Sequence, residues 1–151
     1  MDENDIKVFV EGATHYFQHV SKEPAMAQVP YLISHDESLI YDYTGIIGIS
    51  GNRRGNVYFT APLQMLRLLL LVQGETETTD QNYSDLVGEI ANTLSGNARR
   101  DLGKDFMISV PIVLQGKPEQ LLLAKNSRSF VIPIQWRQYT AALVVSLEKN
   151  G

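Results

Sequence analysis

Apolar residues recur every three or four positions in two segments of the chain, which is the spacing of one face of an α-helix. The first segment covers residues 4–21 and ends at the break Ser21-Lys-Glu-Pro24. The second covers Leu63–Val72, with Pro62 at its start and Gly74 just after its end. Both segments are therefore predicted to be helices. The apolar face of the first consists of Ile6, Val8, Phe9, Ala13, Tyr16, Phe17 and Val20.

A third helical pattern runs from about Ser84 to Leu102 and stops at Gly103, so that Asp85 would lie in its first turn. It follows an acidic, threonine-rich loop from Glu75 to Asp80. Its apolar positions are Leu86, Val87, Ile90, Ala91, Leu94, Ala98 and Leu102. At about 100° per residue, four other positions fall within a stripe of roughly 60° on the opposite side. These are Asp85, Glu89, Asn92 and Gly96.

The remaining apolar segments are short, rich in β-branched residues and bounded by turn residues, which is typical of strands. Gly51-Asn-Arg-Arg-Gly55 would form a hairpin turn, and a second hairpin would turn near Gln138. Strands grouped with three helices, without strict alternation, predict one α+β domain over residues 1–151, with helices packed on a largely antiparallel sheet. The predicted strands are Ala27–Ser34, Ile40–Ser50, Asn56–Thr60, Ile108–Leu114, Gln120–Lys125, Arg128–Trp136 and Ala141–Glu148.

Composition narrows the classes of function. The chain has no cysteine, which excludes disulfides and thiol chemistry, and its net charge is −4. No basic stripe is available to neutralise phosphates, so a nucleic-acid partner is not expected. The longest apolar run, Leu68–Val72, is too short to cross a bilayer, and no signal peptide is recognised. We therefore expect a cytoplasmic protein without membrane insertion.

The segment Glu89-x-x-Asn92-x-x-x-Gly96-x-Ala98 resembles the Glu-x-x-Asn helix of the CheC/CheX/FliY phosphatases, which dephosphorylate the response regulator CheY. The resemblance includes the glycine-marked hairpin from Gly45 to Phe59 and the strand after the motif helix, and covers most of residues 5–148. Two-site members carry a second Glu-x-x-Asn on the first helix, whereas Glu11-Gly-Ala-Thr14 ends in threonine here. The chain is therefore most similar to CheX, and the resemblance implies the CheX-type fold.

Elementary chemistry suggests what the polar stripe with Asp85, Glu89, Asn92 and Gly96, called the polar edge below, can do. Phosphoryl transfer depends mainly on in-line geometry and electrostatic stabilisation, so an amide that holds one water can accelerate hydrolysis of an acyl phosphate. Asn92 suits this role. Glu89 would be repelled by phosphoryl oxygens and is better used to anchor a cation of the partner, which the resemblance identifies as the regulator's active-site lysine. Asp85 and Gly96 would bind the partner on the same edge.

The resemblance also implies that the protein needs no cofactor of its own, because the receiver domain supplies Mg²⁺. It implies a homodimer as well, since CheX-like proteins are typically dimers. Three segments are candidates for the interface of such a dimer. They are the segment with Val29, Tyr31 and Ile33, the closing strand Leu143–Leu147, and the apolar helix Leu63–Val72. The alternative is a monomer whose leucines are all interior.

Other interpretations of the same residues remain open. Asp85 could serve the helix macrodipole, Glu89 could be an ordinary solvated glutamate, and Asn92 could lie on the surface by accident. His15 and His19 are four apart and form a possible two-ligand metal edge, although surface histidines are the better interpretation, and no metal site is predicted. The same helix could dock a receiver as a scaffold without catalysis.

Two smaller features stay without an assigned role. The Gly51–Gly55 segment could contact a phosphate or a partner instead of forming only a turn, but it lacks the ending of a phosphate-binding loop. Pro111 resembles the family's proline after the motif. Its spacing from Asn92 is shorter than in two-site members, so no function is assigned to it.

Overall fold

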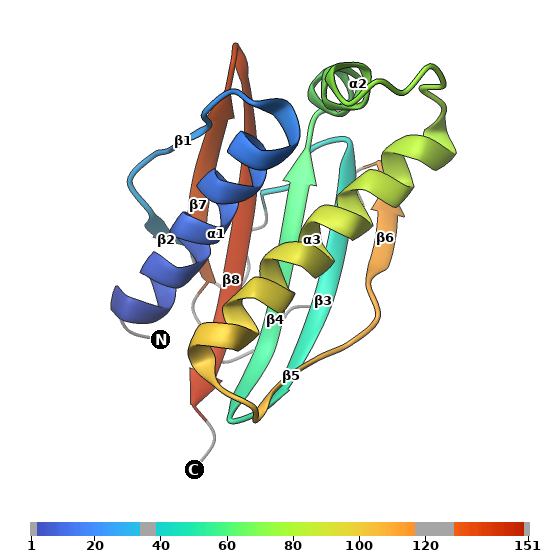
Figure 1. Ribbon diagram of the computed structural model, residues 1–151. Coiled ribbons are helices and arrows are strands. Elements are labelled where there is room, and N and C mark those ends of the chain that lie inside the picture. Colours follow the sequence, from blue (N-terminus) through green and yellow to red (C-terminus); the bar gives the residue numbers. More distant parts are fainter. Residues whose placement is uncertain (1–2, 34–38, 117–128, 150–151) are drawn as a thin grey trace.

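The computed structural model describes residues 3–33, 39–116 and 129–149. Three helices occur in this part of the chain, namely α1 (Glu3–Ser21), α2 (Leu63–Val72) and α3 (Asp80–Leu102). The strands are β1 (Met26–Ala27), β2 (Tyr31–Ile33), β3 (Tyr43–Gly51), β4 (Arg53–Ala61), β5 (Phe106–Ile108), β6 (Ile112–Gln115), β7 (Ser129–Trp136) and β8 (Tyr139–Lys149). Figure 1 shows their arrangement.

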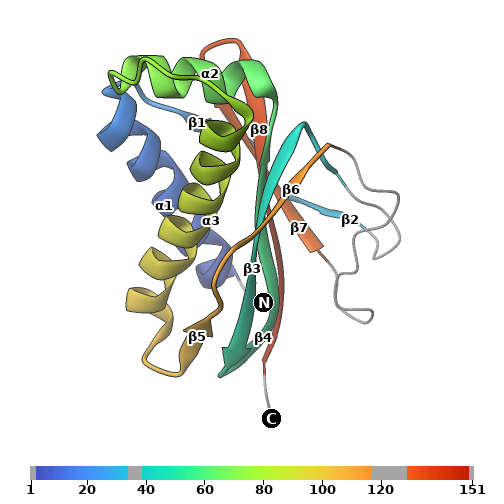
Figure 2. The same cartoon turned by 90° about the vertical axis from the view of Figure 1, so that its right-hand side faces the viewer.

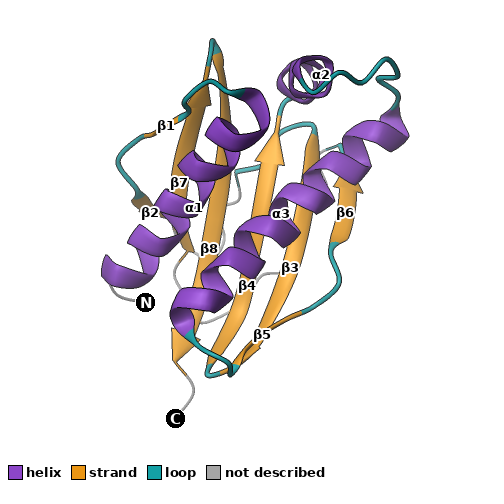
Figure 3. Cartoon of the chain, viewed as in Figure 1, coloured by secondary structure: helices purple, strands orange, loops and turns teal. Residues whose placement is uncertain are grey.

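The strands form one sheet in the order β1-β7-β8-β4-β3-β5, with β2 also paired to β7 and β6 also paired to β3. Every strand pairing in the described residues is antiparallel. The helices lie on one face of the sheet, as the side view in Figure 2 and the colouring by secondary structure in Figure 3 show. The predicted α+β class, with helices packed on an antiparallel sheet, is confirmed.

The central strands are covered on both faces. The main core lies between the helices and the sheet, and a smaller cluster around Tyr58, Val131 and Val144 lies on the opposite face. Strands buried on both faces consist of nearly continuous apolar runs, and Leu143–Leu147 in β8 is such a run. This segment was one of the surfaces considered for self-association, but it offers no edge to a second chain, because β8 lies between β7 and β4.

Helix α3 begins four residues earlier than the apolar pattern predicts. Thr79 is its N-cap, with the Asn82 backbone N–H donating to Thr79 Oγ1 and the Thr79 N–H donating to Asn82 Oδ1 at 3.0 Å. This capping box satisfies two backbone donors and permits a polar first turn. The placement of Asp85 in the first turn is therefore wrong, and Asp80 holds that position.

Several strand boundaries also differ from the predictions. The segment predicted as Ala27–Ser34 forms the two short strands β1 and β2, since Pro30 between them has no N–H to donate. Ser34, Arg128 and the predicted strand Gln120–Lys125 lie outside the described residues. The first hairpin turn is tighter than expected, because β4 already begins at Arg53.

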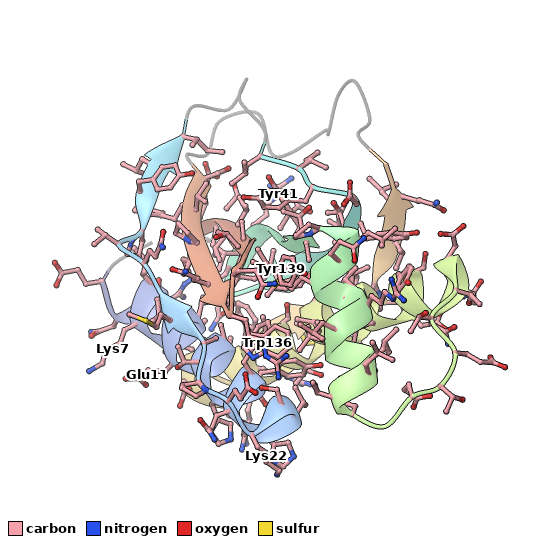
Figure 4. The ribbon with its side chains drawn as sticks, turned by 90° about the horizontal axis from the view of Figure 1, so that it is seen from above. Lys7, Glu11, Lys22, Tyr41, Trp136 and Tyr139 are labelled. Atoms are coloured by element: carbon pink, nitrogen blue, oxygen red, sulfur yellow. The ribbon has the colours of Figure 1, made fainter. Side chains whose placement is uncertain are left out.

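The second hairpin turns where the sequence predicts, with Trp136 paired to Tyr139. At this end of the sheet, the indole N–H of Trp136 donates to Ser21 Oγ at 3.1 Å. Arg137 donates two hydrogen bonds to the Glu23 carboxylate, at 2.6 and 2.7 Å. Figure 4, viewed from above, shows Trp136 beside the end of α1. These bonds attach the C-terminal end of α1 to the β7–β8 hairpin.

Helix α3 lies unusually close to β3. A Cβ added at Gly45 would be 2.5 Å from the carbonyl oxygen of Val87 and 3.1 Å from the Cα of Gly88. Only glycine allows this approach of a helix backbone to a strand. The Gly45–Gly88 crossing thus fixes the height of α3 above the sheet.

We predict that Gly45→Ala lowers the free energy of unfolding by about 1–3 kcal/mol, because the added methyl group overpacks the crossing. The matched control is Gly96→Ala, where a Cβ meets nothing within 4 Å and stability should stay equal or rise by up to about 1 kcal/mol. Urea unfolding followed by circular dichroism measures both. Equal stability of the two variants would contradict the close crossing.

Candidate functional site

Three polar side chains of α3 lie together at a surface groove. Asp85, Glu89 and Asn92 are all exposed and all line it. The groove has a volume of about 570 Å³. Its helix side is completed by Ser84 and Gly88, and its other wall consists of Ile108, Ser109, Val110, Pro111 and Val113 from β5, β6 and the segment between them.

Gly88 brings the two walls together. A Cβ at this position would be 3.1 Å from a methyl carbon of Val113 and 3.8 Å from the ring of Pro111. The absence of a side chain therefore allows the β5–β6 wall to pack directly against α3. Ala91 and Ala98 of the same helix are buried in the core, so simple packing accounts for them.

The far wall of the groove contains a β-bulge. Ile49 pairs with Ile108 and Ile46 with Ile112, so two residues of β3 face three residues of the other strand. Ser109 holds the bulge, because its Oγ accepts a hydrogen bond from the Gly48 N–H at 2.8 Å and its own N–H donates to the Gly48 carbonyl at 2.9 Å. Bulges re-aim side chains and are common beside functional sites.

The sequence predicts a continuous strand Ile108–Leu114 here, and that prediction is wrong. The extra residue divides it into β5 and β6 and leaves Val110 83% exposed at the rim of the groove. Ser109 and Val110 are groove residues that the sequence analysis missed. The available signal was Pro111, because proline within a strand marks an edge or a bulge.

The groove is acidic. Asp85 and Glu89 are the charged residues that line it, and no lysine, arginine or histidine in the described part of the chain does so. Asp85 Oδ1 accepts a hydrogen bond from Gln81 Nε2 at 2.7 Å, which orients its carboxylate along the helix. A free phosphate would be repelled from this surface, whereas a partner that presents a cation would be attracted.

Two buried tyrosines lie next to α3. The Tyr43 hydroxyl donates to Asp80 Oδ1 at 2.5 Å, and burial followed by this bond raises the pKa of Tyr43 to about 12. Tyr16 of α1 is only 6% exposed, and burial followed by the charge of Glu89 raises the pKa of its hydroxyl well above the usual range. Glu89 therefore lies within electrostatic reach of α1 as well as of the groove.

The remaining predicted residues lie outside the groove. Gly96 is on the same helix edge, half-exposed and with open space around it, but does not line the groove. His15 and His19 are exposed, with stacked rings whose centroids are 6.4 Å apart. Within residues 3–33, 39–116 and 129–149, no group of three or more His, Asp or Glu side chains is placed to hold a metal ion.

None of the described helices is both long and apolar enough to span a lipid bilayer.

Solved structures of chemotaxis proteins share this fold. The CheC-like superfamily protein from Shewanella sp. PV-4 aligns with a TM-score of 0.84 and 23% identity, over 98% of this chain and 99% of its own. Chemotaxis protein CheX from Vibrio vulnificus aligns with a TM-score of 0.84 and 23% identity, over 96% of this chain and 99% of its own. CheX in the CheX–CheY–BeF₃–Mg²⁺ complex from Borrelia burgdorferi gives a TM-score of 0.78 at 17% identity, covering 95% of this chain and 97% of its own. The architecture is thus that of the CheC-like and CheX proteins.

The sequence profile of the family described as chemotaxis phosphatase CheX matches residues 43–135. This segment runs from β3 into β7 and contains α3 and both walls of the groove. The chain belongs to the CheX family, and the resemblance drawn from the Glu89-x-x-Asn92 helix is confirmed. No curated protein matches the chain in sequence.

Proposed function

We propose that this protein is a phosphatase that hydrolyses the phosphoaspartate of a CheY-like response regulator. The observation that carries the proposal is the placement of Glu89 and Asn92, both exposed, on one wall of a single groove. Membership of the CheX family supports it. So does the Borrelia structure, in which a CheX of the same fold is bound to CheY with BeF₃ and Mg²⁺.

In the reaction, the oxygen of a water attacks the phosphorus of the receiver's phosphoaspartate. The bond between phosphorus and the aspartate oxygen breaks, which releases the free carboxylate and inorganic phosphate. One proton of the water stays on the new oxygen of the phosphate, and the other passes to a second phosphate oxygen or to solvent. Asn92 has one amide acceptor and two amide donors, so it can accept from this water and hold it in line with the breaking bond. An amide is not a base, and its contribution is geometric.

Glu89 anchors the receiver. The acidic groove would repel the phosphoryl group alone, so the receiver has to bring positive charge with it. A receiver lysine pairs with Glu89, and the receiver's own Mg²⁺ stabilises the charge on the phosphoryl oxygens. Asp85, one turn before Glu89, adds negative charge to the docking edge, and Gly96 leaves that edge open for close approach. The reaction would take place in the cytoplasm.

Asn92→Ala should reduce receiver dephosphorylation by about 100-fold, because an unplaced water loses the in-line geometry. The fold should be unaffected, since alanine is the better helix former at an exposed position. Decay of a phosphorylated receiver measures the effect.

The matched control for this variant is Asn97→Ala, an asparagine of the same helix that does not line the groove, which should keep full activity. Accelerated decay that Asn92→Ala leaves unchanged would reject the water-positioning role. A wild-type protein that binds the receiver without accelerating its decay would favour the non-catalytic scaffold over the phosphatase.

Glu89→Gln should raise the Kd for the activated receiver about 5- to 10-fold at low salt and flatten the dependence of binding on salt. Salt screens an exposed ion pair over a Debye length of about 8–10 Å. Because a neutral amide forms no ion pair, the variant loses the electrostatic part of the binding free energy, which is the part that depends on salt. Calorimetric titrations at several salt concentrations measure both quantities. The control Glu11→Gln makes the same change on the exposed face of α1, and wild-type behaviour of Glu89→Gln would reject the anchor.

We further propose that the protein forms a homodimer. Exposed apolar side chains gather near the outer strands of the sheet, and an edge strand is a surface on which a second chain can pair. On β1, β2 and the segment between them these are Met26, Val29, Tyr31 and Leu32, and on the β5–β6 side they are Met107, Val110 and Ile112. Leu71 and Val72 at the end of α2 are also exposed.

Sedimentation equilibrium at micromolar concentration should therefore give about twice the chain mass of 16.9 kDa. A specific interface of this kind buries more than roughly 1,000 Å² in total. Val29→Lys or Ile112→Lys should shift the mass towards that of one chain, depending on which edge is used. A mass near 16.9 kDa for the wild type across the dilution range would contradict the dimer.

A further inference from the structure

The wall of the groove that faces the polar edge of α3 is apolar. It is formed by β5, β6 and the segment between them, and we call it the strand wall. Four of its five residues are apolar, namely Ile108, Val110, Pro111 and Val113. The fifth is Ser109, whose hydroxyl accepts from the Gly48 N–H and donates to the Val110 carbonyl at 3.0 Å. A ligand in this groove therefore meets carboxylates and an amide on one side and apolar side chains on the other.

Val110 is the exposed apolar residue of the strand wall. It is 83% exposed, whereas the other three apolar residues of the wall are half-buried. Single exposed apolar residues scattered over a surface are common and need no explanation. Val110 is not scattered, because it continues a wall of apolar residues to the rim of the groove. Burial of its side chain by a partner would be favourable, since apolar surface would leave water.

The local structure holds Val110 in this exposed position. The Ser109 backbone N–H donates to the Gly48 carbonyl at 2.9 Å, and the Ser109 hydroxyl bonds to the Val110 carbonyl. Pro111 follows directly and restricts Val110 to extended backbone conformations. A side chain that is held in place before binding loses less conformational entropy when a partner covers it. The bulge thus presents Val110 in a form suited to binding.

The two walls together define the chemistry of a suitable partner. Asp85 and Glu89 attract positive charge, while the strand wall offers apolar surface and no charge. A lysine side chain combines both properties, because its aliphatic stem packs on apolar surface while its ammonium group pairs with a carboxylate. The groove therefore fits a protein surface on which a cation lies beside apolar side-chain atoms.

We propose that the strand wall is an apolar docking surface for the response regulator, centred on Val110, which buries apolar side-chain atoms of the receiver next to the cation that pairs with Glu89. The inference rests on the proposed function, which makes the receiver the partner of this groove. The polar edge then supplies the part of the binding free energy that depends on salt, and the strand wall supplies the apolar part. A second copy of the chain is the competing occupant, since Val110 lies near an outer strand of the sheet.

Val110→Ser tests the apolar contact. We expect the Kd for a beryllofluoride-activated CheY-like receiver to rise about 5- to 20-fold, because burial of the valine methyl groups is lost. The dependence of binding on salt should stay as in the wild type, in contrast to Glu89→Gln. The heat-capacity change of binding should become less negative, which is the mark of reduced apolar burial. Calorimetric titrations at several salt concentrations and temperatures measure all three quantities.

The matched control is Val29→Ser, the same change at a residue that is also 83% exposed. Val29 lies between β1 and β2, at the other side of the sheet from β5. This variant should bind the receiver as the wild type does, and both variants should melt like the wild type because the substituted residues are exposed. Wild-type affinity for Val110→Ser would overturn the docking surface, and so would an equal loss of affinity in the two variants.

The mass of the free protein separates the receiver from a second copy of the chain as the occupant. Sedimentation equilibrium of Val110→Ser at micromolar concentration should give the same mass as the wild type. A lower mass for this variant would assign Val110 to a contact between copies and overturn the proposal.

Receiver decay keeps this inference separate from the proposed function. If the wild type accelerates decay of the phosphorylated receiver while Val110→Ser binds with unchanged affinity, the docking surface fails and the proposed function stands. If Val110→Ser loses affinity as expected but the wild type leaves the decay at its intrinsic rate, the proposed function fails and the docking surface stands. Absence of binding between the wild type and the activated receiver would also overturn the docking surface.

Discussion

The close approach of α3 to β3 is the constraint on which the rest of the site depends. Gly45 has no side chain beneath the carbonyl of Val87, and Gly88, one residue further along the helix, has none beneath Val113. The two glycines allow α3 to lie directly on the sheet while the β5–β6 wall closes against its side. The groove is therefore formed by backbone proximity, and the polar edge of α3 is presented at a fixed height beside the exposed rim at Val110.

In the proposed reaction, the charge of this groove divides the chemistry between two proteins. The protein offers carboxylates and an amide but no cation among the described residues that line the groove. Such a site is suited to complete another active site and cannot bind a phosphate well by itself. In the proposed reaction Asn92 positions water and Glu89 binds the partner. Exposed residues would thus carry the chemistry, while the buried glycines determine where those residues stand.

The sequence predicted the parts of the structure that depend on local periodicity. The helix face with Glu89 and Asn92, the extent of α2 and the hairpin at Gln138 follow from spacing, proline and turn residues, and the structure contains them. The start of α3 was missed because a capping box, and not an apolar residue, begins that helix at Thr79. The apolar run of β8 was taken for an edge because a strand buried on both faces and an attractive edge strand look alike in sequence.

The far wall of the groove could not be predicted at all from such patterns. It depends on a register difference of one residue between β3 and the strand opposite, and register is set by tertiary pairing. The same holds for the Gly45–Gly88 crossing, which joins residues distant in the chain. Sequence thus predicted one wall of the site, and the fold supplied the other.

The central claim is that the groove turns over a phosphorylated receiver. The most direct test is the decay of a phosphorylated CheY-like receiver from the same genome, followed over time with and without a substoichiometric amount of this protein. We expect the decay to be accelerated, with each molecule of protein releasing many equivalents of inorganic phosphate. Decay at the intrinsic rate of the receiver, in the presence of folded protein that binds it, would contradict the claim.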